Sequence, residues 1–105
     1  MTAAILSPRA QLEQRRAALW IAKDSPASAR RFAQAVKDLA SRIGDFPESG
    51  TKRPDLAAAP FRFALIRGFP YLAVYNAERS PPLIVRIVHG ARDLPAVLRD
   101  LAERS

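Results

Sequence analysis

The feature that most constrains the fold is a series of three short strand-like runs in the second half of the chain. They cover residues 61–66, 71–76 and 83–89 and are rich in aromatic and β-branched side chains, which suit the pleated surface of a sheet. Segments containing Gly, Pro or Ser separate them at residues 67–70 and 77–82. Because connections this short join strands that are neighbours in space, the pattern predicts an antiparallel meander.

The third run has apolar residues on both faces. Its odd-numbered positions from Leu83 to His89 would share one face, and its even-numbered positions from Ile84 to Val88 would share the other. A strand that is apolar on both sides is covered on both sides. We therefore expect this strand to lie centrally in the sheet, with helices over one side.

The first half of the chain begins with an apolar stretch at residues 3–6, which predicts a short strand. It stops at Ser7-Pro8, where serine can cap a helix and proline can occupy its first turn. Helix-forming residues then continue to about Lys23. The residues expected on the buried face of this helix are Leu12, Leu19 and Trp20.

A second helix is predicted after Asp24-Ser25-Pro26, which repeats the combination of a cap and a proline. Its apolar residues recur at steps of three and four from Ala29 to Ile43, and Gly44 is expected to end it. Two helices joined by so short a turn lie nearly antiparallel. Residues 8–43 therefore predict a helical hairpin.

Residues 44–60 hold three prolines and two glycines, which predicts a long surface connection in which residues 55–59 can form one helical turn. After the third strand, Asp93 is expected to cap a final helix over Pro95–Glu103, with Arg92 bracing Asp93 or its neighbours. The sequence thus predicts an α+β fold, with a helical hairpin packed on an antiparallel sheet in the order β-α-α-β-β-β-α. We expect one domain over residues 1–105.

Charge and cysteine content narrow the classes of function. The net charge is +7 and fourteen of the seventeen cations are Arg, whose planar guanidinium binds carboxylate or phosphate in two places. Acidic proteins and nucleic acids both fit as partners, while an Arg content that reflects genome composition and solubility is the alternative. The chain lacks cysteine, a signal-peptide pattern and an apolar run long enough to span a membrane, so we expect a cytoplasmic protein without disulfides.

The inventory of catalytic residues is small. His89 is the single histidine, which excludes a His pair and a His-based metal cluster, and the four glycines form no phosphate-binding loop. The carboxylates are scattered without the paired spacing of a hydrolase. We therefore expect neither a metal nor a cofactor, and we interpret His89 as a packed or hydrogen-bonded structural residue.

Arginine residues on the predicted strands are the strongest functional signal. Residues 61–92 contain five Arg and one acid, Glu78. Arg62 and Arg86 lie within strands, where a guanidinium must find an acid, cover an aromatic ring or face a partner, unless it is simply solvated. Tyr71 and Tyr75 share one strand face and would either stack on bases or belong to the core.

Several segments resemble the RelE/ParE toxin superfamily, most closely its ParE branch. The stretch VRIVHGARDL at residues 85–94 is similar to the closing strand and turn of that superfamily. LSPRA at residues 6–10 is similar to its start, and DFPESG at residues 45–50 to the segment after its helical hairpin. Arg62 falls where the family often has an Arg entering the sheet. The resemblance implies the same helical hairpin on an antiparallel sheet.

The two branches imply different activities. The RelE branch implies a ribosome-dependent messenger-RNA endonuclease that uses Lys, Arg and a C-terminal Tyr, but this chain has no Tyr after Tyr75. This departure favours the ParE branch, which implies a non-nucleolytic poison of DNA gyrase paired with a ParD-type antitoxin that folds on the toxin. An inactive toxin kept as a regulatory partner is a third possibility.

The resemblance does not fix the contact residues, so we assign candidates from basic charge, aromatic character and place in the predicted fold. The expected partners are an acidic ParD-type antitoxin in a hetero-oligomer and DNA gyrase. Candidate gyrase contacts are Arg86, Arg92 and Arg99. Candidate antitoxin contacts are Trp20, Phe32, Arg62 and Arg67. The RNA contacts of the alternative nuclease would be Lys52, Arg53, Arg62 and Arg86.

Overall fold

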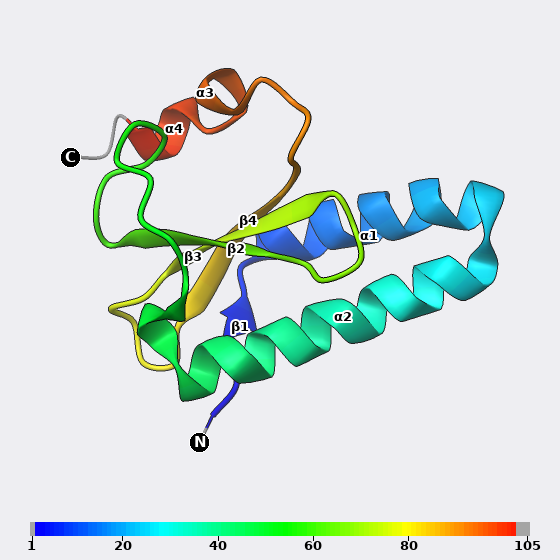
Figure 1. Cartoon of the computed structure of the whole chain (residues 1–105), viewed down its shortest axis with the longest axis horizontal. Coiled ribbons are helices and arrows are strands. Elements are labelled where there is room, and N and C mark those ends of the chain that lie inside the picture. Colours follow the sequence, from blue (N-terminus) through cyan, green and yellow to red (C-terminus); the bar gives the residue numbers. More distant parts are fainter. Residues whose placement is uncertain (1, 103–105) are drawn as a thin grey trace.

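The structure, a computed structural model, describes residues 2–102 (Figure 1). The predicted order of elements is confirmed, although the part of the final helix expected at Glu103 lies outside the described residues. None of the helices within residues 2–102 is both long and apolar enough to cross a membrane. The elements are β1 (Ile5–Leu6), α1 (Pro8–Asp24), α2 (Pro26–Asp45), the 3-10 turn η1 (Pro47–Ser49), β2 (Phe61–Leu65), β3 (Tyr71–Asn76), β4 (Leu83–His89), α3 (Leu94–Val97) and α4 (Arg99–Ala102).

The sheet has the strand order β1-β4-β3-β2. The pairs β2/β3 and β3/β4 are antiparallel, which confirms the predicted meander. Strand β1 runs parallel to β4 and pairs with its first two residues, so the complete sheet is mixed rather than purely antiparallel. The predicted central place of β4 is confirmed, because β4 lies between β1 and β3.

The predicted division of β4 into odd and even faces is wrong, because a β-bulge interrupts it. The register shifts between Val74 and Tyr75 on β3, and this leaves Val85 of β4 without an opposite residue. A bulge inserts one residue and changes which faces the following side chains occupy. Ile84 and Ile87, three residues apart, consequently pack into the same core cluster.

The helical hairpin forms at the predicted places. Ser7 Oγ accepts a hydrogen bond of 3.1 Å from the N–H of Ala10 at the start of α1, and Ser25 Oγ accepts one of 3.1 Å from Ser28 at the start of α2. Each side chain satisfies an N–H that has no partner inside its helix. Figure 1 shows α1 and α2 on one side of the strands, with α3 and α4 on the other.

The buried face predicted for α1 is wrong. Leu12, Leu19 and Trp20 are exposed, whereas the buried positions of α1 are Ala10 and Ala17. Small side chains let one element approach its neighbours closely, and α1 packs against both α2 and β4. The large helical side chains buried in this core cluster come from α2, namely Phe32, Val36, Leu39 and Ile43.

Helix α2 continues one residue past Gly44, which was expected to end it. The glycine serves a close approach instead. A Cβ atom at Gly44 would lie 2.8 Å from the Cα of Ala3, too close for any other residue. The N-terminal segment crosses α2 here, and the N–H of Ala4 donates to the carbonyl of Ala40 at 2.9 Å.

The second face of the sheet is covered by the 51–60 segment and the C-terminal helices. The expected continuous final helix is interrupted at Leu98, which is fully buried between α3 and α4. Asp93 occupies the N-cap position, as predicted, but its carboxylate makes no capping bond. Burial of apolar side chains therefore stabilises this segment without a side-chain cap at its start. The second cluster comprises Leu56, Ala57, Phe61, Phe63, Val74, Val88, Leu98 and Leu101.

Two side chains of the sheet fasten the loop after α2. The hydroxyl of Tyr75 donates to Pro47 O at 2.7 Å and accepts from Gly50 N at 2.9 Å. Arg62 Nη1 donates to the carbonyls of Glu48 and Gly50 at 3.1 and 2.9 Å. Tyr75 is fully buried, so the interpretation of this tyrosine as core is confirmed and its use for base stacking is excluded in this conformation.

We predict that Tyr75→Phe lowers the free energy of unfolding by about 2 kcal/mol, because it leaves a backbone donor and a backbone acceptor without their partner. Urea denaturation of both proteins measures the difference. Tyr71→Phe is the matched control, since the Tyr71 hydroxyl has no hydrogen-bond partner within residues 2–102. Equal losses in the two variants would show that the Tyr75 hydroxyl does not hold the loop.

Candidate functional site

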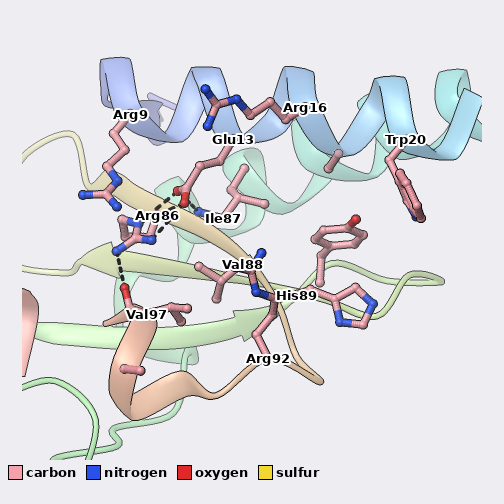
Figure 2. A pocket seen from close by; sticks show the side chains of 13 residues that line it. Arg9, Glu13, Arg16, Trp20, Arg86, Ile87, Val88, His89, Arg92 and Val97 are labelled. Atoms are coloured by element: carbon pink, nitrogen blue, oxygen red, sulfur yellow. Dashed lines mark hydrogen bonds and ion pairs between the residues drawn. The ribbon is translucent and has the colours of Figure 1, made fainter. Parts of the chain in front are cut away.

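A groove of about 630 Å³ runs along the outer edge of β4, between α1 and the C-terminal segment (Figure 2). Four of its lining residues are Arg and one is an acid, so the groove is basic. Because three separate stretches of the chain meet here, the sequence order alone does not reveal it. The lining residues are Arg9, Glu13, Arg16, Ala17, Trp20, Tyr71, Arg86, Ile87, Val88, His89, Arg92, Ala96 and Val97.

A buried ion pair closes one end of the groove. Arg86 Nε donates to both carboxylate oxygens of Glu13 at 3.1 Å, and Nη2 donates to Oε2 at 3.0 Å. Arg86 Nη1 donates to the carbonyl of Val97 at 2.8 Å and to Asp100 Oδ1 at 3.3 Å. A guanidinium with this many partners has its buried charge compensated.

The hypotheses that placed Arg86 on a gyrase-contacting or RNA-contacting surface lose their basis. Arg86 is 4% exposed, and its donors already have partners within the protein. The alternative stated for a strand arginine, that it finds an acid, is what the structure shows. The physical reason is the packing of α1 along β4, which brings Glu13 within hydrogen-bond distance of this side chain.

Glu13 is the site residue that sequence reasoning missed. Besides Arg86, its Oε1 accepts a hydrogen bond of 2.9 Å from the backbone N–H of Ile87. The carboxylate therefore takes the place that a neighbouring strand's carbonyl would occupy. Glu13 and Arg86 are 73 residues apart, and no local sequence pattern links the two residues.

Exposed cations line the rim of the groove. Arg9, Arg16 and Arg92 are exposed, and Arg9 reaches Asp100 at 3.9 Å. Within residues 2–102, neither Arg16 nor Arg92 makes an ion pair, so the expected bracing of Asp93 by Arg92 does not occur. Side chains of this kind are available to the carboxylates or phosphates of a partner.

Aromatic rings lie at the far end of the groove. Trp20 is 65% exposed, and Lys23 Nζ lies 4.8 Å from the centre of its ring. The rings of Tyr71 and His89 meet edge to face at 5.1 Å, and His89 Nδ1 accepts a hydrogen bond of 3.0 Å from Ala91 N. The packed and hydrogen-bonded state predicted for His89 is confirmed.

Of the four candidate antitoxin contacts, Trp20 alone lines this groove. Phe32 is fully buried and packs against Phe69 and Tyr71 at 5.1 and 5.3 Å, so its assignment to an exposed surface is wrong. The reason is that Phe32 lies on the apolar face of α2, which packs into the core. Arg62 is tied to the loop after α2, and Arg67 is exposed on the β2–β3 turn beside a separate hollow under α2.

The remaining candidates lie outside the groove. Lys52 and Arg53 are exposed on the loop before β2, and Arg99 is exposed on α4. Arg53 donates to both carboxylate oxygens of Asp55 at 3.1 and 2.9 Å, and this hydrogen bonding lowers the pKa of Asp55. Three of the four predicted RNA contacts thus have their guanidinium groups engaged within the protein.

We predict that Glu13→Gln lowers the free energy of unfolding by about 3 kcal/mol, because it leaves the buried Arg86 guanidinium without its main counter-charge. Chemical denaturation followed by circular dichroism measures the change. Glu78→Gln, an exposed acid in the β3–β4 turn, is the control and should change stability by less than about 0.5 kcal/mol. A Glu13→Gln protein as stable as this control would contradict the structural role of the ion pair.

Comparison with known proteins places these observations in a family. The family model described as the ParE toxin of the type II toxin-antitoxin system, parDE, matches residues 4–94. No curated protein sequence matches the chain significantly. The family match spans α1, α2 and the whole sheet, including all of the groove except its C-terminal wall. The chain belongs to the ParE toxin family and is the toxin of a type II toxin-antitoxin system.

Proposed function

We propose that this toxin poisons DNA gyrase without cutting nucleic acid and that an acidic ParD-type antitoxin neutralises it by binding the basic groove. Membership of the family shows that the chain is a toxin and implies that it has an antitoxin partner. One observation supports the proposed target and mode of binding. The acid of the groove, Glu13, is already paired with Arg86, and the other charged residues that line the groove are arginines.

A ribonuclease needs a group that removes the proton from a ribose hydroxyl. Glu13 is held by Arg86, and His89 Nδ1 is occupied by Ala91 N–H. Arginine remains protonated at physiological pH and does not serve as a base. The groove is therefore suited to binding a partner rather than to proton transfer, which favours the gyrase poison over the nuclease.

The groove also has the properties that an antitoxin would use. Its rim is positively charged and its end carries an exposed tryptophan, and large aromatic side chains with arginines dominate the binding energy of protein interfaces. Opposite charge speeds encounter at low ionic strength, and aromatic burial slows dissociation. An acidic antitoxin with apolar anchors matches both features.

Expression of the toxin without its antitoxin should arrest growth and raise DNA double-strand breaks while bulk translation continues at first. The purified protein should increase the amount of cleaved DNA held by gyrase. A break assay in cells and a gyrase cleavage assay in solution measure these effects, and mapping of transcript ends is done in parallel.

Transcripts cut on ribosomes without DNA breaks would contradict this prediction and support the RelE-like nuclease. In that case the Tyr71→Phe variant tests whether the hydroxyl of Tyr71, which lines the groove, takes part in proton transfer during RNA cleavage. A toxin that causes neither effect would instead be an inactive regulatory partner.

Trp20→Ala should speed dissociation of the antitoxin roughly 30-fold, which corresponds to a truncated anchor worth about 2 kcal/mol. The free toxin should lose less than about 0.5 kcal/mol of stability, because the side chain is already largely exposed. Surface plasmon resonance with the antitoxin encoded beside the toxin measures the dissociation rate.

Leu19→Ala is the matched control for Trp20→Ala. Leu19 is the neighbouring residue of α1, is 69% exposed and does not line the groove. Equal dissociation rates for the two variants would exclude Trp20 as an anchor. A large loss of stability in Trp20→Ala would show that the ring supports the fold.

A further inference from the structure

We infer that the groove receives an acidic peptide in an extended conformation, which adds to the sheet as a strand parallel to β4 beside Ile87 and His89. The inference rests on the proposed function in one respect, since the natural source of such a peptide would be the antitoxin. The observations that carry it are the backbone hydrogen bonds along the outer edge of β4.

The outer edge of β4 is only partly covered. Strand β1 pairs with Leu83 and Ile84, and the last backbone bond on this side runs from Ser7 N to Ile84 O at 2.9 Å. After this point β1 ends and α1 begins, so no strand of residues 2–102 lies beside the rest of β4. The uncovered part forms the floor of the groove.

The direction of the backbone groups follows from the pairing with β3. Gly90 N donates to Pro70 O at 2.8 Å, and bonding alternates along an antiparallel pair, so the backbone groups of Val88 face β3. Those of Ile87 and His89 therefore face the groove. The bond from Ile87 N to Glu13 confirms this direction.

Two of these four outward groups are already used and two are not. Ile87 N–H donates to Glu13, and His89 C=O accepts from Arg92 N at 3.1 Å. The carbonyl of Ile87 and the N–H of His89 have no hydrogen-bond partner within residues 2–102. An unpaired acceptor and donor at the edge of a sheet form a template for a further strand.

The two free groups, together with the direction of β1, favour a parallel orientation of the added strand. The closely spaced bonds of an antiparallel pair need both backbone groups of one residue, and here neither residue has both groups free. An antiparallel strand would therefore reach the two free groups only through two different residues of the peptide. In a parallel pair, one residue bonds the carbonyl of one position and the N–H two positions later. The Ile87 carbonyl and the His89 N–H match the parallel pattern, which would continue the direction of β1.

The charge of the groove selects the sequence of the peptide. Exposed Arg16 extends from α1 and exposed Arg92 from the turn after β4, and both line the groove (Figure 2). Alternate side chains of a strand point to opposite faces, so acidic residues can meet these arginines while apolar residues meet Trp20 and the apolar floor. A helix would leave the two free backbone groups buried and unpaired, which is unfavourable.

The test uses the full-length toxin, labelled with nitrogen-15, and a blocked ten-residue peptide of alternating Glu and Val. We expect saturable binding, at least tenfold slower hydrogen exchange of the His89 amide, and no change for the Leu65 amide on the opposite edge of the sheet. N-methylation of the peptide at successive positions should weaken binding most at one position, the residue whose N–H donates to the Ile87 carbonyl.

Charge-reversal variants test the acidic character of the peptide. Arg16→Glu and Arg92→Glu should each raise the peptide's Kd at least tenfold. Arg15→Glu is the matched control, since Arg15 is exposed on the same helix and does not line the groove, and it should change the Kd less than threefold.

Absence of peptide binding, binding that leaves His89 exchange unchanged, or insensitivity to N-methylation would each overturn the added strand. Preferential binding of a short single-stranded DNA with the same arginine dependence would also overturn it, in favour of a nucleic-acid site. Gyrase poisoning is measured without any peptide. A toxin that poisons gyrase but fails the peptide tests therefore overturns the strand alone, and the reverse result overturns the proposed target alone.

Discussion

The ion pair between Glu13 and Arg86 is the interaction on which the arrangement of this molecule depends. It connects α1 to β4 through four hydrogen bonds, one of which comes from the backbone of Ile87. The same guanidinium holds the C-terminal segment through Val97 and Asp100. A buried charge is tolerated when its partners are this complete, so helix, strand edge and C-terminal segment depend on one another.

The same pair explains why the groove is a binding surface. Glu13 is paired with Arg86 and so does not neutralise the positive charge at the rim of the groove, where Arg16 and Arg92 face solvent. The exposure of Trp20 has a related origin, because α1 packs through Ala10 and Ala17 and turns its large side chains outward. Such a surface suits a toxin that binds a partner and is released again, because the fold is stable even when no partner covers the groove.

Much of the fold could be predicted from local signals. The Ser-Pro caps fixed the starts of both helices, and the three strand-like runs correspond to β2, β3 and β4 within one residue. Local signals failed where packing decided the outcome. Leu12 and Leu19 of α1 are exposed, Gly44 serves a close approach, and the C-terminal helix is interrupted where Leu98 enters the core. Three of the candidate contacts named from the sequence line the groove, Trp20, Arg86 and Arg92, and Arg86 is buried in an ion pair there.

The sequence by itself determined the element order, the hairpin, the meander, the net charge and the likeness to ParE toxins, because caps, turns, periodicity and composition act over a few residues. The tertiary structure alone decided the parallel pairing of β1, the bulge at Val85, the partnership of Glu13 with Arg86 and the free edge at Ile87 and His89. These features join residues far apart in the chain. They follow from which buried polar groups find partners after the elements pack, and no local pattern records that outcome.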